Sequence, residues 1–445
     1  MLRIYEVDEA LGSILKRKPI DEFPVSPAMR QRTIATFGED IPPDEAVRRI
    51  LADVRARGDD ALIEWTRRLD GVELTPDTLE VPDDDIAAAY DLVDSEVVAA
   101  LERAAERIRA FHERQPFHSW MDSDLGGLLG QMIRPLNRVG VYIPGGTAPL
   151  ASTLLMTAIP ARAAGVNEVV VCSPADRRTG KIAPITLVAA DIAEADAVYA
   201  IGGAQAIGAL AYGTQTIARV DKIAGPGNTF VVLAKKQVFG AVGIDALPGP
   251  TETVVVADDS ANPAWVAADM LAQSEHTGGT AILITPSLEL ARAVDRHLQA
   301  QVSQLATAAD IYESFESRSG AVIVEDLMEA VVLADDFAPE HLCLSVRDPW
   351  AWVGKIHNAG GLFVGEQSYE VLGDYVAGPS HTMPTGGTAR FASPCNVLDF
   401  VRVTNVIALD EATSRQIAPV AVKLAEAEGL PAHAAAARIR LAGQG

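Results

Sequence analysis

The sequence predicts an α/β protein with two parallel sheets. Two stretches, residues 138–250 and 253–364, alternate short apolar strands with helices. Their strands are continuous apolar runs, which indicates burial on both faces, as in a parallel sheet covered by helices. With 445 residues, the chain is long enough for two or more domains. We therefore expect two α/β domains with an active site between them.

Composition and charge exclude several classes of protein. Hydrophobic residues make up 49% of the chain and charged residues 22%, which is typical of a globular protein. The net charge of -23 argues against a nucleic-acid-binding protein, because nothing offsets repulsion from phosphates. No run of about 18 uncharged apolar residues is present, so we expect no membrane span. The N-terminus lacks a signal-peptide core, and three widely spaced cysteines form no zinc pattern, which favours a reducing cytoplasm.

The N-terminal part of the chain is predicted to be a scaffold without a site of its own. Residues 1–30 are short and mixed, and predict an arm rather than a core element. Residues 43–115 carry helical patterns, with a helix expected over 60–69 and another over 94–113.

The first α/β stretch begins at Arg138. Apolar runs predict strands over 139–143, 168–172 and 197–201, and the intervening segments predict helices near 152–156, over 182–192 and up to 210. Glycine-rich turns follow these strands. Ligands of such sheets bind at the carboxyl ends of the strands, where these turns lie.

The glycine turns by themselves do not identify a ligand. They form no G-x-G-x-x-G pattern with an acidic residue after the next strand, so the usual dinucleotide fingerprint is absent. Glycines that only make tight turns explain them about equally well. At the turn 225–228, Asn228 is expected to cap the helix 229–239, where a phosphate could also sit.

The second stretch repeats the alternation. Strands are expected over 253–257, 281–285, 321–324 and 361–364, with helices over 263–273 and 288–298. From residue 401 a strand-like piece precedes two helices. This tail is too small to form a core alone, so we expect it to pack on a partner subunit.

A short segment, Phe337-Ala338-Pro339-Glu340-His341-Leu342, presents an ionisable pair on a stiff turn. Pro339 ends the preceding helix and is expected to bias Ala338 to extended geometry. A histidine titrates near neutrality, and a neighbouring carboxylate can orient the ring or activate a water. For the hexapeptide alone, a semi-buried histidine beside a solvated glutamate is the more common explanation.

Other polar residues gather in the second half of the chain. Gln273 and His276 are three residues apart and share a helix face, which suits a borderline metal, although a polar last helical turn is the more common explanation. Asp374 lies in a loop, and His381 and His433 lie in segments constrained by proline. Spacing alone does not show that these groups meet.

The chain as a whole resembles the histidinol dehydrogenase family. The resemblance covers nearly the whole length and is densest at Arg138-Val139-Gly140-Val141-Tyr142-Ile143-Pro144-Gly145-Gly146-Thr147-Ala148-Pro149-Leu150. It continues, in the same order as in the family, through the segments 201–206, 225–228, 273–276, 338–342, 373–375 and 432–433.

The resemblance implies a role for each matching residue. Glu340 and His341 would be the catalytic pair. The remaining roles it implies are NAD contacts by Tyr142, Gln205 and Asn228; one zinc per chain held by Gln273, His276, Asp374 and His433; and substrate contacts by Thr251, Gln273, His276, His341, Asp374, His381, Glu428 and His433. The family usually has serine where this chain has Thr251, which keeps the hydroxyl and adds a methyl group.

The resemblance also implies the architecture. We expect two Rossmann-like domains in a homodimer whose active sites are shared, with small N- and C-terminal segments packed on the partner and His433 supplied by the partner's tail. Residues 138–250 would form the NAD-binding domain, and residues 31–137 with 251–395 the domain that carries the catalytic and metal residues. Residues 1–30 would be an N-terminal arm and residues 396–445 a tail domain.

The implied reaction is oxidation of L-histidinol to L-histidine through L-histidinaldehyde, with two NAD molecules. His341 suits removal of the hydroxyl proton, and Glu340 suits activation of a water. Two alternatives stay open: a paralogous dehydrogenase of another small polar alcohol or diol, and an inactive metal- or nucleotide-binding protein. A pocket sized for imidazole beside His381 and Glu428 would favour histidinol.

Overall fold

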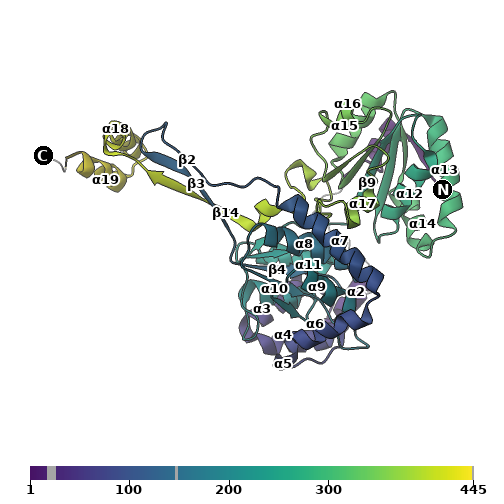
Figure 1. The fold of residues 1–445 in the computed structure, drawn as a ribbon, viewed down its shortest axis with the longest axis horizontal. Coiled ribbons are helices and arrows are strands. Elements are labelled where there is room, and N and C mark those ends of the chain that lie inside the picture. Colours follow the sequence, from purple (N-terminus) through teal and green to yellow (C-terminus); the bar gives the residue numbers. More distant parts are fainter. Residues whose placement is uncertain (18–26, 146–148, 443–445) are drawn as a thin grey trace. The chain divides into compact units, whose positions relative to one another are not determined.

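The computed structural model describes residues 1–17, 27–145 and 149–442. The chain divides into two compact units. The first comprises Met1–Arg114 and Leu136–Phe400, and the second Gln115–Pro135 and Val401–Gly445. The first unit contains two parallel sheets, as the sequence predicts (Figure 1). In the described ranges no helix is both long and apolar enough to cross a membrane.

A five-stranded parallel sheet forms one half of the first unit, with the strand order β6-β5-β4-β7-β8. The chain proceeds from the central strand β4 to β5 and β6 on one side, and then to β7 and β8 on the other. The carboxyl ends of β4 and β7 therefore flank a topological switch point, where such sheets bind ligands. The strands are β4 (Arg138–Tyr142), β5 (Glu168–Cys172), β6 (Ala197–Tyr199), β7 (Lys222–Ala224) and β8 (Gly243–Ile244).

Helices cover this sheet and are covered in turn by the N-terminal helices. Helix α10 is apolar all round, so it must be covered on the side away from the sheet as well. The buried stripe of α3 covers it, and a Cβ at Gly208 would lie 3.2 Å from the Leu51 side chain. The inner helices are α8 (Ala151–Ala163), α9 (Pro184–Ile192), α10 (Gly203–Tyr212) and α11 (Thr229–Val238); the outer ones include α3 (Pro43–Arg57), α4 (Asp59–Asp70), α6 (Asp83–Ala89) and α7 (Ser95–His112).

This packing corrects the expected domain boundaries. The predicted domain combines residues 31–137 with 251–395, but α3 contacts α10 and α11, α6 contacts α9, and α7 contacts α8. The N-terminal helices thus belong with the five-stranded sheet. The sequence could not show this, because an amphipathic helix does not specify which apolar surface it covers.

A six-stranded parallel sheet, with the order β1-β11-β10-β9-β12-β13, forms the other half of the first unit. Successive residues of its central strand point into different cores: Val255 packs with Met270 and Leu283, and Val254 with Ile282 and Leu342. The strands are β1 (Ile4–Glu6), β9 (Glu252–Ala257), β10 (Thr280–Thr285), β11 (Gly320–Ile323), β12 (His341–Ser345) and β13 (Gly361–Val364). The helices are α1 (Val7–Gly12), α12 (Pro263–Ser274), α13 (Leu288–Val302), α14 (Ala308–Ser317), α15 (Leu327–Phe337), α16 (Trp350–Val353) and α17 (Glu370–Tyr375).

Strand β1 corrects the prediction of an N-terminal arm. Ile4 pairs with Ala321 in parallel register, and Tyr5 is buried. The first residues therefore complete an edge of the six-stranded sheet within this chain. Three residues are too few to show a strand pattern, and only the unpaired edge of β11 gives them that conformation. Residues 18–26 of the predicted arm lie outside the described residues.

The second unit is built from two distant segments. Strand β14 pairs antiparallel with β3 from Val401 opposite Pro135 to Ala408 opposite Leu128. Helices α18 and α19 pack on one another around a small core of Val422, Ala425 and Ala434 (Figure 1). The predicted tail domain of residues 396–445 is thus incomplete, because residues 115–135 supply β3 and β2. The elements are β2 (Trp120–Asp122), β3 (Leu128–Pro135), β14 (Val401–Ala408), α18 (Glu411–Ala427) and α19 (Pro431–Ala442).

Candidate active site

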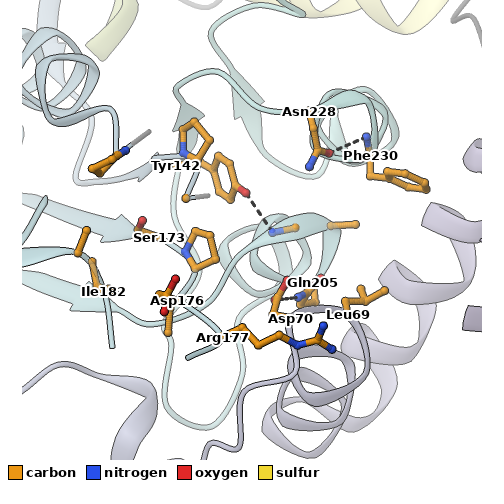
Figure 2. Close-up of a pocket in the computed structure, with 18 of the residues that line it drawn as sticks. Leu69, Asp70, Tyr142, Ser173, Asp176, Arg177, Ile182, Gln205, Asn228 and Phe230 are labelled. Carbon is orange, nitrogen blue, oxygen red and sulfur yellow. Dashed lines mark hydrogen bonds between the residues drawn. The ribbon is translucent and has the colours of Figure 1, made fainter. Parts of the chain in front are cut away.

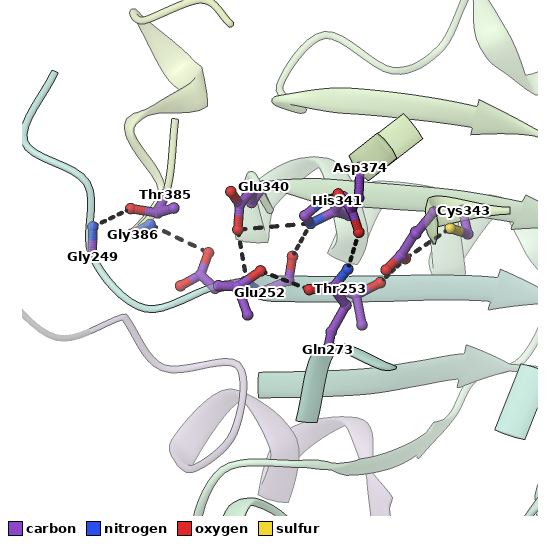
Figure 3. Close-up of polar contacts among 12 residues, drawn as sticks. Gly249, Glu252, Thr253, Gln273, Glu340, His341, Cys343, Asp374, Thr385 and Gly386 are labelled. Carbon is purple, nitrogen blue, oxygen red and sulfur yellow. Dashed lines mark hydrogen bonds and ion pairs between the residues drawn. The ribbon is translucent and has the colours of Figure 1, made fainter. Parts of the chain in front are cut away.

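The predicted catalytic residues lie at the amino edge of the six-stranded sheet. Thr251 immediately precedes β9, and His341 is the first residue of β12, opposite Thr253 in β9. Gln273 lies in the last turn of α12, which leads into β10. Asp374 lies on α17, which follows β13 (Figure 3). The carboxyl-edge rule therefore does not apply to this sheet, because its polar groups come from helix ends and turns that enter the strands.

The turn before His341 is left-handed rather than extended. Ala338 has φ 50° and ψ 63°, which corrects the sequence prediction. Its N–H donates to the carbonyls of Ala334 at 3.1 Å and Asp335 at 3.2 Å, so it closes the last turn of α15. These contacts outweigh the preference of a residue before proline for extended geometry. A non-glycine residue held in this region costs about 1–3 kcal/mol, so surrounding contacts must hold the turn.

The residue that stops α15 is Pro339, which has no N–H to donate to the helix. The pair that follows is buried: Glu340 is 7% exposed and His341 is 3% exposed. The Nδ1 atom of His341 lies 3.2 Å from the Glu252 carbonyl and 3.6 Å from the Glu340 carboxylate. Its Nε2 atom lies 3.4 Å from Asp374 Oδ1. The imidazole is therefore held between carboxylates from two elements.

The environment shifts the pKa of both members of the pair. Burial raises the pKa of Glu340 to about 7, and the charge of His341 opposes this shift only in part. Burial lowers the pKa of His341, but the negative charges of Glu340, Asp374 and Glu370 outweigh it, and the net shift is upward. The carboxylates thus stabilise the imidazolium, which is the form produced when His341 accepts a proton.

A chain of hydrogen bonds joins Thr251, Gln273 and Asp374. The Thr251 hydroxyl donates to Gln273 Oε1 at 2.9 Å, and Gln273 Nε2 donates to Asp374 Oδ2 at 3.1 Å. Gln273 is 2% exposed, so its amide orientation is fixed by these two partners. Burial opposes ionisation of Asp374, but the hydrogen bond and charge of His341 lower its pKa overall.

Two further histidines lie near these hydrogen-bonded residues. His381 Nδ1 is 2.6 Å from the Asp374 carbonyl, and His381 Nε2 is 3.0 Å from the Thr153 hydroxyl. Burial lowers the pKa of His381, against the charge of Asp374, and the charge of His276 lowers it further. His276 follows the end of α12 and is exposed. The structure therefore gathers Gln273, His276 and Asp374 around His341 and His381.

The other two predicted residues lie in the second unit. Glu428 follows α18 and His433 lies in α19, and both are exposed. Within the described ranges, no three His, Cys, Asp or Glu side chains are placed to hold a metal ion. Gln273 is not one of these residue types, but its amide oxygen can also bind a metal ion.

The predicted cofactor residues line one cavity of about 700 Å³ at the carboxyl edge of the five-stranded sheet. Tyr142 ends β4 and accepts a hydrogen bond from the Gly203 N–H at 3.1 Å (Figure 2). Gln205 Nε2 donates to Asp70 at 3.2 Å, and among the described residues its buried Oε1 has no partner. Asn228 caps α11 as predicted, since its Oδ1 accepts from the Phe230 and Val231 N–H groups. Residues 146–148 of the glycine motif lie outside the described residues.

A buried ion pair that the sequence analysis missed supports this cavity. Lys235 is completely buried and pairs with Asp245. Its ammonium donates to the Gly225 carbonyl at 2.9 Å, and Asp245 accepts from the Gly225 N–H at 2.7 Å. The pair thus fixes the backbone that leads to Asn228. A lysine that follows the run 231–234 of apolar residues was the available signal.

Comparisons with known proteins identify the family of this chain. The family model described as histidinol dehydrogenase matches residues 39–441. The histidinol dehydrogenase of Deinococcus radiodurans is 53% identical over 426 residues, which cover 95% of this chain and 97% of that protein. The enzyme of Thermus thermophilus is 49% identical over 398 residues, covering 89% and 94%. The chain belongs to the histidinol dehydrogenase family.

A solved structure extends the agreement to the fold. The crystal structure of histidinol dehydrogenase from Elizabethkingia anophelis superposes with a TM-score of 0.90 at 32% identity, covering 99% of this chain and 98% of that one. The resemblance to the histidinol dehydrogenase family is thus confirmed, and the chain is an enzyme of the oxidoreductase class. Every predicted site residue falls within the matched range of the family.

The hydrogen bond between Thr251 and Gln273 yields a stability prediction. Thr251→Val should lower the free energy of unfolding by about 1–3 kcal/mol, because the buried Gln273 oxygen loses its donor. Thr251→Ser keeps the hydroxyl and should cost less than about 1 kcal/mol. Urea denaturation of both variants beside the wild type measures this difference. Equal losses in the two variants would show that the hydroxyl does not hold Gln273.

Proposed function

We propose that this enzyme oxidises L-histidinol to L-histidine through L-histidinaldehyde, with NAD as oxidant and zinc as a resident metal. The observation that carries the proposal is the buried Glu340–His341 pair beside the Asp374–Gln273 hydrogen bond. Membership of the histidinol dehydrogenase family supports the choice of substrate. Thr251 keeps the hydroxyl of the usual serine, and that hydroxyl is engaged with Gln273, which favours histidinol over another alcohol.

The protein groups suit both oxidations. In the first, the neutral form of His341 accepts the hydroxyl proton while the carbon loses a hydride, and the neighbouring carboxylates stabilise the imidazolium that results. Because the pKa of His341 is raised, this neutral form becomes more abundant as the pH rises. In the second, Glu340 takes a proton from a water that adds to the aldehyde carbon, and the protonated His341 gives its proton to the aldehyde oxygen, which forms a neutral hydrate. The resulting hydrate then gives its hydroxyl proton to His341 as the second hydride leaves. Bound NAD supplies the hydride acceptor, one molecule for each step.

The donor set fits zinc. Gln273 and Asp374 offer oxygen atoms, and His276 offers a nitrogen atom; the lowered pKa of Asp374 keeps its carboxylate ionised. His433 of a partner subunit would add a second nitrogen. Bound zinc would hold the substrate's imidazole and amine in place as a template. Glu428 and His381 would contact the same substrate, with Glu428 pairing with its ammonium group.

A homodimer with shared active sites follows from the same proposal. Apolar side chains of the second unit are exposed in the single chain: Ile407 is 74% exposed, Leu424 60% and Val420 59%. Apolar surface of this extent favours burial against a second copy. Glu428 and His433 lie in this unit, so a partner could supply both to the site.

The first prediction of the proposal concerns substrate and metal. Purified enzyme should form about two NADH per L-histidinol and contain about one zinc per chain. A chelator should abolish activity, and added zinc should restore it. His276→Ala should lose both metal and activity, while His297→Ala, on α13, serves as the control. No NADH from L-histidinol by the metal-loaded enzyme would refute the proposed function.

The second prediction concerns the catalytic pair. His341→Asn should cripple both oxidations by about 100-fold or more, because the proton acceptor is gone. Glu340→Gln should slow histidinaldehyde oxidation much more than histidinol oxidation. Because Glu340 accepts a proton only as a carboxylate and its pKa is about 7, wild-type aldehyde oxidation should fall as the pH drops below about 7. Glu340→Gln should lack the part of this fall that protonation of Glu340 causes, and should keep only the dependence on pH that the raised pKa of His341 gives to both proteins. Equal losses in both steps would contradict the division of labour.

The third prediction concerns the shared site. Inactive His341→Asn and inactive His433→Ala subunits should regain activity when mixed, because one of the two sites in a heterodimer then has both wild-type residues. The measurement is NADH formation after subunit exchange has been verified by mass spectrometry of tagged chains. Exchange without recovered activity would mean that His433 serves its own chain.

A further inference from the structure

Arg17, which follows α1 near the N-terminus, contacts the turn that carries Glu340 and His341. Its Nε atom donates to the Phe337 carbonyl at 2.8 Å, and its Nη2 atom donates to the Ala338 carbonyl at 3.1 Å. The guanidinium carbon also lies 3.5 Å from the centre of the Phe337 ring. Arg17 therefore holds the residues at which α15 ends and the chain turns toward Glu340.

These contacts stabilise the turn in two ways. The carbonyls at the end of α15 have no partner within the helix, and a cation near a helix C-terminus is favourable. Ala338 is also held in a left-handed conformation that an alanine adopts only at a cost. The planar guanidinium can donate to several oxygens at once, which a lysine ammonium does with less geometric control.

The same guanidinium reaches the strand beside the turn. Arg17 Nη1 forms an ion pair with the Glu252 carboxylate, which also accepts from the Gly386 N–H at 3.3 Å. The Glu252 backbone contacts both members of the pair: its N–H donates to Glu340 Oε2 at 3.2 Å, and its carbonyl lies 3.2 Å from His341 Nδ1. Arg17 thus joins the two backbone segments whose separation sets the geometry of the pair. Figure 3 shows Glu252, Glu340 and His341 of these segments.

We infer that Arg17 is a positioning residue for Glu340 and His341, acting through the Phe337–Ala338 carbonyls and Glu252. The inference rests on the proposed function, since it assigns Arg17 to the geometry of that catalytic pair. Arg17 precedes the residues 39–441 matched by the family model. The N-terminal segment thereby gains a role in a site formed by residues far along the sequence.

Hydrogen exchange gives a test that needs no substrate. In Arg17→Ala, the amides of residues 337–343 should exchange about 10-fold faster or more than in the wild type, while those of residues 225–235 at the cofactor cavity stay unchanged. The matched control is Arg3→Ala, which removes an exposed arginine that pairs with Glu9 in the same N-terminal segment. Exchange at 337–343 that is equal in Arg17→Ala and Arg3→Ala would overturn the inference.

Kinetics give the second test. A misplaced pair should lower kcat by about 10- to 100-fold in Arg17→Ala, with little change in the dissociation constant for NAD. Arg17→Lys should retain part of kcat, and millimolar guanidinium should restore part of the activity of Arg17→Ala. A loss that guanidinium and lysine both fail to relieve would overturn the positioning role. If the wild type itself does not oxidise L-histidinol, the proposed function fails, and the exchange experiment still decides the contacts of Arg17.

Discussion

The candidate active site depends on how the chain passes from α15 into β12. Ala338 closes the helix in a left-handed conformation, Pro339 prevents any further turn, and His341 is already the first residue of a buried strand. The connection between the end of the helix and an imidazole that lies between two carboxylates is therefore very short. Such a connection leaves the pair little freedom, which is what proton transfer in a fixed geometry requires.

The two sheets of the first unit carry their polar site residues at opposite edges. The five-stranded sheet offers the carboxyl edge of β4 and β7, where the N-terminus of α11 favours a negatively charged group. In the six-stranded sheet the site residues lie at the amino edge of β9 and β12, where helices α12 and α15 end. Helix C-termini favour positive charge, so this edge suits an imidazolium or a metal ion better than a phosphate.

Burying carboxylates near the amino edge of the six-stranded sheet costs free energy. Glu370 is completely buried, and it accepts from the Cys343 thiol at 2.9 Å and from the Thr253 hydroxyl. Among the described residues its second oxygen has no partner, and burial raises its pKa. Nearby, burial and the charges of Glu370 and Glu366 raise the pKa of Asp269 to about 7. In their ionised form these buried carboxylates lower the stability of the fold, and a neighbouring positive charge offsets this cost.

The sequence by itself determined the local elements: the continuous apolar strands, the helices between them and the Asn228 cap follow from short residue patterns. The motif residues Tyr142 and Gln205 were also predictable, and the structure places them on one cavity with Asn228. Only the tertiary structure decided how the elements combine. The cover of α10 by α3, the edge strand β1, the pairing of β14 with β3 and the contacts of Arg17 with the end of α15 all depend on distant segments. Local patterns cannot specify such contacts, because their free energy arises only when both partners are already in place.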